Sequence, residues 1–160
     1  MPTRRQFLAA SAASALSAAL VHRDLFAAAT DAASGALPMV TVYKDPGCEC
    51  CTRWCKHLSA NGFVVQPRDV ANVDEIKHTM GVPERLQSCH TAVVGRYVVE
   101  GHVPADLVKK MLTEQPQIVG LAAPGMPEGS PGMEGPKKDK YDILTFDRAG
   151  KTTVFATRGA

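Results

Sequence analysis

The sequence has no large excess of charge of one sign, no internal repeat of solenoid length and no long hydrophobic run after its first residues. Of the 18 basic and 16 acidic side chains, three arginines and one aspartate fall within residues 1–29, so the rest of the chain is electrically neutral. A neutral chain without a stripe of lysine and arginine predicts no nucleic acid or anionic lipid partner. The roughly 130 residues that follow residue 29 are enough for one domain with a single core.

Residues 1–29 have the three parts of an export signal, which are a basic start, a short apolar stretch and a region of small residues. The paired Arg4 and Arg5 before Phe7 and Leu8 resemble a twin-arginine signal, which carries folded proteins across a bacterial inner membrane. The apolar stretch is too short for a comfortable membrane span. We therefore expect a periplasmic protein with no membrane contact after signal removal. A short amphipathic helix of the mature protein is the alternative.

Hydrophobic periodicity and turn residues predict the secondary structure of the remaining chain. The expected elements are a strand at 39–43, a helix from about 50 to 60, a strand at 63–70, a helix at 75–80, a hairpin at 91–101 and a helix at 105–113. This order predicts an α/β fold with a thioredoxin-like mixed sheet flanked by helices. A right-handed crossover makes the first two strands parallel, and the hairpin adds an antiparallel edge.

The rest of the chain is expected to form a loop and a second hairpin. Residues 121–140 are rich in glycine and proline, carry two methionines and show no periodicity, so we expect a Gly/Pro/Met loop. Residues 141–157 are expected to form a C-terminal β-hairpin. The predicted domain then spans residues 38–160 and includes both.

Cysteine is scarce, yet four of the five cysteines fall between residues 48 and 55. Structural disulfides explain this cluster poorly, because adjacent cysteines such as Cys50 and Cys51 rarely bridge each other. Cys48, Cys50 and Cys51 lie at the expected start of a helix, where free backbone N–H groups and the helix dipole stabilise thiolates. Cys48 and Cys51 also have the C-x-x-C spacing of a dithiol redox site, which is the alternative to metal binding.

The fifth cysteine, Cys89, precedes the third expected strand together with His90. In a thioredoxin-like fold this loop faces the start of the first helix, so Cys89 is expected to approach Cys48, Cys50 and Cys51. Convergent thiolates form a soft site that selects Cu(I), with zinc as the less favoured metal. His90 is expected to be a ligand or to support one. His102 is either a ligand or an exposed loop histidine.

Two methionines and one further cysteine complete the set of soft side chains. Met126 and Met133 lie in the expected loop, and a thioether is a soft ligand for Cu(I) that survives oxidising compartments. The same loop can instead be a hydrophobic cover on the surface. Cys55 lies one turn deeper in the helix than Cys51, on its apolar face, and is expected in the core. His57 is expected to face solvent.

Several stretches together resemble the CopG-type family of exported bacterial proteins, whose members often carry only the label of a domain of unknown function. The stretches are YKDPGCECCTRW, GVPERLQSCHTAVVGRYVVEGHVPADLVKKML and GLAAPGMPEGSPGMEG, within a match from about Val40 to Phe155. The resemblance implies a thioredoxin-like fold, a periplasmic setting and a role in copper resistance. It places the family's C-x-C-C motif on Cys48, Cys50 and Cys51, its Ser-Cys-His-Thr motif on Cys89 and His90, its Gly-His-Val-Pro motif on residues 101–104, and its paired methionines on Met126 and Met133. Cys55 is a departure from the family pattern.

The sequence therefore predicts a periplasmic Cu(I)-binding protein of copper resistance. The predicted metal ligands are Cys48, Cys50, Cys51, Cys89, His90, His102, Met126 and Met133. The expected partners are the copper ion and other periplasmic copper-handling proteins. The alternative is an enzyme, a thiol–disulfide or copper-redox oxidoreductase that uses Cys48 and Cys51.

Overall fold

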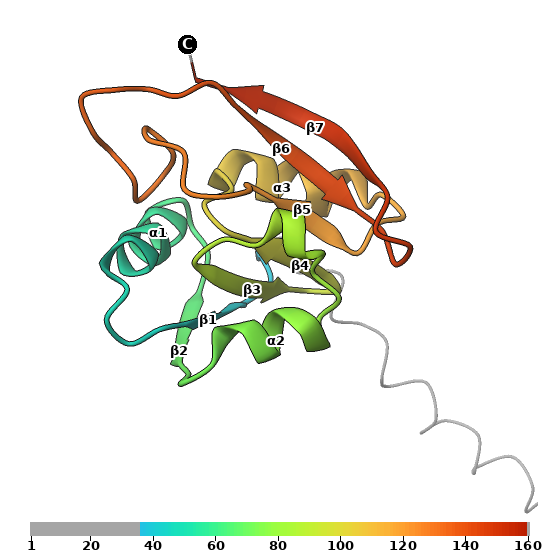
Figure 1. Ribbon diagram of the computed structural model, residues 1–160, viewed down its shortest axis with the longest axis horizontal. Helices are drawn as coiled ribbons and strands as arrows, with labels where there is room; N and C mark the ends of the chain where they lie inside the picture. The colour runs from blue at the N-terminus through green and yellow to red at the C-terminus, as the bar shows by residue number, and fades with distance from the viewer. Residues whose placement is uncertain (1–35, 160) are drawn as a thin grey trace, which may run out of the picture. The chain divides into compact units, whose positions relative to one another are not determined.

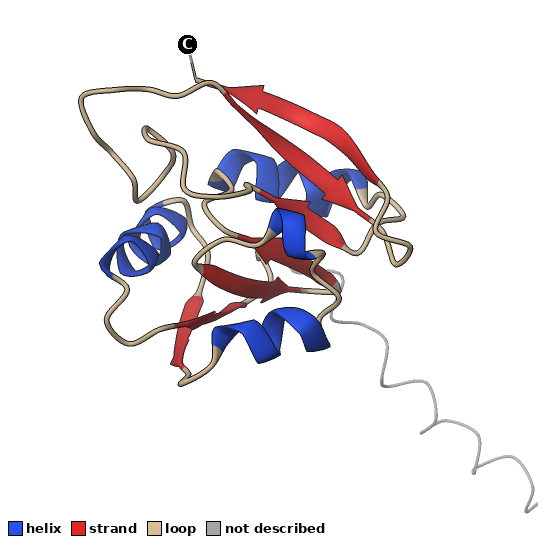
Figure 2. Cartoon of the chain, in the orientation of Figure 1, coloured by secondary structure: helices blue, strands red, loops and turns tan. Residues whose placement is uncertain are grey.

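The structure is a computed structural model that describes residues 36–159, so the expected export signal at residues 1–29 lies outside the described residues. The elements are β1 (Val40–Lys44), α1 (Glu49–Ala60), β2 (Val65–Asp69), α2 (Val73–Thr79), the short 3-10 helix η1 (Glu84–Leu86), β3 (His90–Val94), β4 (Tyr97–Glu100), α3 (Ala105–Glu114), β5 (Gly120–Ala122), β6 (Tyr141–Phe146) and β7 (Thr152–Arg158). They form one mixed sheet in the order β2-β1-β3-β4-β5-β6-β7 with helices packed against it (Figures 1 and 2).

The strand pairings confirm the predicted thioredoxin-like order. β1 and β2 are parallel and are joined by α1, and β1 pairs with β3 in antiparallel orientation. β3 and β4 form the predicted antiparallel hairpin through a turn at Gly95. Pro67 lies in β2 at the edge of the sheet, where its missing N–H breaks no ladder hydrogen bond.

The carboxyl-terminal part of the sheet differs from the prediction in two respects. Residues 121 and 122, expected in the loop, belong to β5, which pairs in parallel with β4. The predicted hairpin 141–157 is present as β6 and β7, but it extends the same sheet through β5. β4 is therefore an interior strand and not an edge. Gly120 permits this pairing, because a Cβ atom there would lie 1.9 Å from the Val98 carbonyl oxygen.

The sheet has apolar side chains on both faces. One face packs against α1 and α3 through Trp54, Leu58, Val108 and Met111, among other residues. The opposite face carries a smaller cluster near η1, made of Val82, Leu86, Val98, Ala122 and Phe146. Within residues 36–159, no helix is long and apolar enough to cross a membrane.

Helix α1 has the predicted start, buried face and end. Cys48 is the N-cap, and its Sγ accepts a hydrogen bond from the Cys51 backbone N–H at 3.3 Å. Cys51, Trp54, Cys55 and Leu58 form the buried face. Asn61 ends the helix and is followed by Gly62 at φ +89°, a left-handed conformation that favours glycine.

Candidate metal centre

Four cysteines meet where the start of α1 approaches the loop before β3. The sulfur atoms of Cys48, Cys50, Cys51 and Cys89 all lie within 4.8 Å of one another. Cys50 Sγ is 3.4 Å from Cys48 Sγ and 3.8 Å from Cys89 Sγ, although Cys89 is 39 positions further along the chain. The predicted convergence of these four cysteines is confirmed.

Two of the four sulfurs form a disulfide, and they belong to the two cysteines with the C-x-x-C spacing. Cys48 and Cys51 are joined by an S–S bond, and Cys50 and Cys89 are free thiols. The structure therefore shows an oxidised site with the C-x-x-C pair closed. Cys51 is fully buried, while Cys48 is partly exposed beside a hollow of about 260 Å³ along the outer side of α1. Cys48 is thus the more exposed residue of the disulfide.

His102 is fully buried and points at the cluster, so the alternative of an exposed loop histidine is wrong. Its Nδ1 lies 2.7 Å from the Pro131 carbonyl oxygen and its Nε2 lies 2.9 Å from Cys89 Sγ. A carbonyl oxygen only accepts hydrogen bonds, so Nδ1 carries the proton and Nε2 presents its lone pair to Cys89. Burial lowers the pKa of His102, against the effect of the Pro131 carbonyl. The imidazole is thus neutral and oriented as in a metal ligand.

His90 lies on the other side of Cys89 and is also fully buried. Its Nδ1 is 3.5 Å from Cys89 Sγ, and its Nε2 has no hydrogen-bond partner among the described residues. The ring stacks against Trp54 at 4.4 Å and meets the edge of His102 at 5.1 Å. Burial holds the pKa of His90 well below its usual value, and His102 adds to this effect. Nδ1 is thus the ring nitrogen of His90 that faces the Cys89 sulfur, and the buried Nε2 is left without a partner.

The protonation of Cys89 follows from the same surroundings. Burial, together with the neighbouring Cys50, raises the pKa of the Cys89 thiol to about 12. Without metal, Cys89 is therefore a neutral thiol whose S–H donates to His102 Nε2. A metal ion that binds this sulfur must displace the proton, so binding here releases protons.

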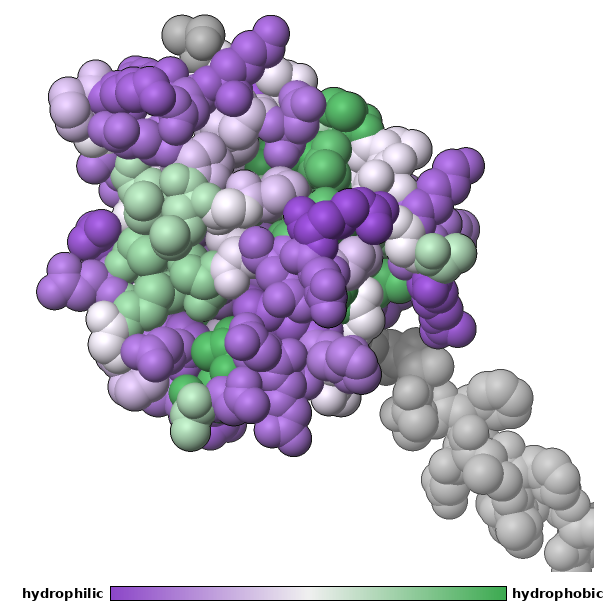
Figure 3. Space-filling view, viewed as in Figure 1, coloured by the Kyte–Doolittle hydropathy of each residue, from purple (hydrophilic) through white to green (hydrophobic). Residues whose placement is uncertain are grey.

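The loop that follows β5 packs against the cluster through its backbone. Arg53 Nε donates to the Gly132 carbonyl oxygen at 2.9 Å, and a Cβ atom on Gly132 would lie 2.7 Å from the Cys50 carbonyl oxygen. The glycine at this position lets the loop lie directly on the first turn of α1. Figure 3 shows a weakly hydrophobic patch over this region, where α1 and the loop lie side by side.

The two methionines of this loop are near its anchor points. Met133 follows Gly132 and is partly buried, whereas the Met126 side chain is 56% exposed. Ser88, which precedes Cys89, donates a hydrogen bond from its hydroxyl to the carbonyl oxygen of Gly125, the residue before Met126. Both methionines thus belong to backbone segments that contact the site. The roles of Arg53 and Pro131 had no recognisable signal in the sequence.

Two other side chains of α1 lie outside the groups of ligand-type atoms. Cys55 is 7% exposed and packs among core residues, and the groups of ligand-type atoms found in residues 36–159 do not include it. The prediction of a core position is confirmed. His57 was expected to face solvent, which is wrong, because its Nε2 accepts a hydrogen bond from the Ala105 N–H at the start of α3.

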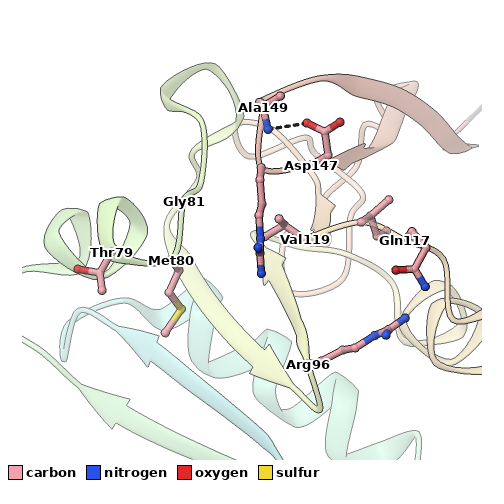
Figure 4. Close-up of a pocket in the computed structure, with 10 residues that line it drawn as sticks. Thr79, Met80, Gly81, Arg96, Gln117, Val119, Asp147 and Ala149 are labelled. Atoms are coloured by element: carbon pink, nitrogen blue, oxygen red, sulfur yellow. Dashed lines mark hydrogen bonds between the residues drawn. The ribbon is translucent and has the colours of Figure 1, made fainter.

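A larger cavity of about 920 Å³ lies elsewhere, between the end of α2, the start of β5 and the β6–β7 turn (Figure 4). The residues among 36–159 that line this cavity include no cysteine or histidine. Asp147 accepts hydrogen bonds from Ala149 N and Lys151 N of its own turn, and Arg96 donates to Tyr97 Oη and to the Gln115 carbonyl. Two charged side chains of this cavity, Asp147 and Arg96, are thus engaged by neighbouring groups.

Comparison with known proteins identifies the family. The family model described as "Protein of unknown function, DUF411" matches residues 86–133. The solved structure named "Copper resistance protein copG- Form 2" is 44% identical, with a TM-score of 0.73, and the match covers 76% of this chain and 98% of that one. For "Copper resistance protein copG- Form 1" the identity is also 44%, the TM-score 0.72 and the coverage 77% and 99%. The chain belongs to the CopG-type copper resistance family. A comparison with curated protein sequences finds no match.

The family model covers only part of the candidate metal centre. Residues 86–133 include Cys89, His90, His102 and both loop methionines, but not the C-x-C-C motif of α1. The segment from η1 to the Met loop therefore carries the family pattern by itself. The CopG-type relatives and the cysteine cluster together indicate copper binding.

Proposed function

We propose that this CopG-type protein binds Cu(I) in the periplasm and takes part in copper resistance. The observation that carries the proposal is the convergence of four cysteine sulfurs within 4.8 Å, with the imidazoles of His90 and His102 beside Cys89. Thiolate sulfur and imidazole nitrogen suit Cu(I), and zinc is the less favoured alternative. The proposed ligands are Cys48, Cys50, Cys51, Cys89, His90, His102, Met126 and Met133.

Copper loading requires the reduced site. Reduction of the Cys48–Cys51 disulfide by a thiol reductant takes up two electrons and yields two thiols, so all four cysteines become available. Each loses its proton when it binds copper, and thiolates that bridge ions allow more than one Cu(I) in the cluster. His102 needs no proton transfer, because its Nε2 lone pair already faces the cluster.

The same proposal assigns the parts of the chain. Residues 1–29 act as a twin-arginine export signal, and residues 38–160 form the metal-binding domain with its Met loop and carboxyl-terminal hairpin. The Met loop supplies thioethers to the site from the two segments that contact it. Other periplasmic copper-handling proteins deliver or accept the ion, and the partly exposed Cys48 is the side of the cluster that they reach.

Anaerobic titration of the reduced protein without residues 1–29 tests this proposal. Cu(I) is added in competition with a Cu(I) chelator, and the bound copper per protein is measured with Zn(II) as the comparison metal. We expect Cu(I) to be taken from the chelator and to resist exchange for zinc. The proposal is wrong if the reduced protein takes no Cu(I) from the chelator or binds Zn(II) more tightly.

An oxidoreductase is the second candidate, and the disulfide at Cys48–Cys51 is the observation that favours it. In a copper-redox reaction two thiols become one disulfide, two Cu(II) ions become two Cu(I) ions, and two protons are released. In thiol–disulfide exchange a partner thiolate attacks Cys48 Sγ and expels Cys51. Both reactions need Cys48 and Cys51. Thiol–disulfide exchange needs neither Cys50 nor Cys89, so substitutions of these two cysteines distinguish exchange from copper binding.

A further inference from the structure

A buried carboxylate holds the chain on both sides of the Cys89–His90 pair. Glu100, at the end of β4, accepts a hydrogen bond from the Ser88 backbone N–H at 2.7 Å and from Thr91 Oγ1 at 2.6 Å. Ser88 is the residue before Cys89, and Thr91 is the residue after His90. A single side chain therefore fixes both ends of the dipeptide that carries a thiol and an imidazole of the cluster.

A buried lysine completes this arrangement from another element. Lys77 of α2 lies 2.6 Å from Glu100 Oε1 and donates to Thr91 Oγ1 at 3.2 Å. The side chains of Lys77 and Glu100 are 2% and 0% exposed. A buried ion pair adds little net stability, because the desolvation of two charges offsets their attraction. The hydrogen bonds to Ser88 and Thr91 give the pair a role that stability alone does not explain.

The pair lies on the opposite face of the sheet from the cysteines. Successive side chains of β3 alternate between the two faces, so His90 points toward Trp54 and α1, while Thr91 points toward α2. Within residues 36–159, Lys77 and Glu100 make no hydrogen bond to the sulfur atoms, so they do not belong to the ligand set. They act on the cluster through the backbone of β3 and the loop before it.

Glu100 is also followed in the chain by the segment that carries His102. The next residue, Gly101, donates its N–H to the His90 carbonyl oxygen at 3.0 Å. Gly101 has φ +70°, and a Cβ atom there would lie 2.6 Å from Ser88 Cβ. The segments 88–91 and 100–102 are therefore packed together at the point where Glu100 bonds to the first of them.

We propose that the Lys77–Glu100 pair is a positioning device for the metal centre, which sets the place of Cys89 and His90 relative to the α1 cysteines and His102. This inference rests on the proposed copper-binding function. Lys77 anchors the Glu100 carboxylate, and the carboxylate anchors the ligand loop. Groups that do not bind the metal but hold its ligands in place change metal affinity by about 10-fold to 100-fold when they are removed.

The test replaces the ion pair without leaving a buried charge. In the Lys77→Met/Glu100→Leu variant two apolar side chains of similar size fill the space, an exchange that folded proteins tolerate, but Ser88 N–H has no acceptor. We expect the free energy of unfolding to fall only by the loss of the Ser88 hydrogen bond, while the Cu(I) affinity falls by about 10-fold to 100-fold. Lys77→Met/Glu100→Gln is the rescue, because an amide oxygen can still accept from Ser88 N–H, and its affinity should return toward the wild-type value.

Val98→Ala is the matched control, because Val98 lies on the same strand and the same face as Glu100 but belongs to an apolar cluster. It should lower stability without changing Cu(I) affinity. The inference is overturned if the leucine variant binds Cu(I) as tightly as wild type, or if Val98→Ala loses as much affinity. If the leucine variant does not fold, Thr91→Val is used in its place. This substitution removes the hydrogen bond from Thr91 Oγ1 to Glu100 at nearly constant side-chain volume and keeps the one from Ser88 N–H. Wild-type affinity in Thr91→Val then overturns the inference.

A second readout keeps the inference separate from the proposed function. Amide hydrogen exchange at Ser88 is measured by NMR in the metal-free protein. Exchange should be slow in wild type, in the glutamine variant and in Val98→Ala, and faster in the leucine variant. If wild type binds no copper, the proposed function fails, but fast exchange in the leucine variant still supports the positioning of this loop. Unchanged exchange in that variant contradicts it.

Discussion

Cys51 and Cys55 lie one turn apart on the same buried face of α1, yet they belong to different parts of the molecule. The Cys51 sulfur lies within 4.8 Å of the other cluster sulfurs, including that of Cys89. Cys55 packs in the core with its pKa raised, first by burial. The first turn of α1 faces the loop before β3, while the later turns face the sheet and α3.

This comparison shows that the segment facing each cysteine of α1 determines whether it belongs to the sulfur cluster or to the core. The later turns hold the first turn in place, because Trp54 Nε1 donates to the Val103 carbonyl oxygen at 2.9 Å and His57 accepts from Ala105 N–H. Val103 and Ala105 lie one and three residues after His102 in the chain. The core side of α1 therefore keeps the cysteine motif and His102 at a fixed separation.

The largest expected effect comes from the cluster cysteines that are outside the disulfide. Cys50→Ser and Cys89→Ser should each sharply weaken Cu(I) binding, because a hydroxyl is a poor ligand for a soft ion and each loss breaks the set of thiolates. Both variants should keep most thiol–disulfide exchange activity, which needs an attacking and a resolving cysteine at positions 48 and 51. Chelator competition and an exchange assay measure the two activities. Wild-type copper binding in both variants would show that Cys50 and Cys89 are not ligands and would contradict a site that needs all four thiolates.

The next largest effect is expected from Gly132, in the loop that lies on the first turn of α1. Gly132→Ala would place a Cβ atom 2.7 Å from the Cys50 carbonyl oxygen and 2.9 Å from Trp54 N. Overpacking of this kind costs about 1–3 kcal/mol, and the displaced loop should also weaken copper binding. Gly125→Ala is the matched control, because Gly125 has φ +68° in the same loop but nothing lies within 4 Å of its Cβ position. Chemical unfolding and Cu(I) titration of both variants check the difference, and equal effects would show that the loop does not depend on this contact.

The core cysteine should affect stability alone. Cys55→Ala leaves a small cavity, so the free energy of unfolding should fall by on the order of 1 kcal/mol while the bound copper per protein is unchanged. Denaturant titration and copper analysis measure the two quantities. A drop in bound copper at unchanged folding would place Cys55 among the ligands.

The smallest effect is the pH dependence that His57 contributes. Burial lowers the pKa of His57, against the acidic Glu134 and Asp106, so the folded protein binds this proton less well than the unfolded chain. The contribution of His57 to stability is therefore present above the pKa of the unfolded histidine, near 6.5, and is lost as the pH falls below it. Unfolding between pH 7.5 and 5.5 should show a shallower pH dependence in His57→Gln than in wild type. Equal slopes would mean that the cap of α3 does not depend on neutral His57.

The sequence was sufficient to predict those features that depend on local patterns. The apolar spacing of α1 defined its buried face, and the order of elements placed Cys89 opposite Cys48. Features that depend on contacts between distant segments were missed. β5 has only three residues, and its pairing with β4 needs Gly120 to approach Val98, which no local pattern reveals.

The metal centre shows the same limit. Buried charges such as Lys77 and Glu100 look like ordinary surface residues in the sequence, although Glu100 ends an otherwise apolar strand and needs a partner once buried. The orientation of His102 depends on Pro131, a residue of the Met loop. The C-x-x-C spacing indicated that Cys48 and Cys51 could pair, but not which redox state the site adopts.

X-ray absorption spectroscopy at the copper edge, on the reduced and copper-loaded wild-type protein, tests the central claim most directly. Copper held by the thiolates of Cys48, Cys50, Cys51 and Cys89 should be Cu(I) with mainly sulfur neighbours at a distance close to the roughly 2.3 Å of a zinc–thiolate bond. Loading Cys55→Ala should leave the spectrum unchanged, whereas Cys89→Ser should reduce the sulfur contribution. A copper ion surrounded only by nitrogen and oxygen would contradict a thiolate-held copper site.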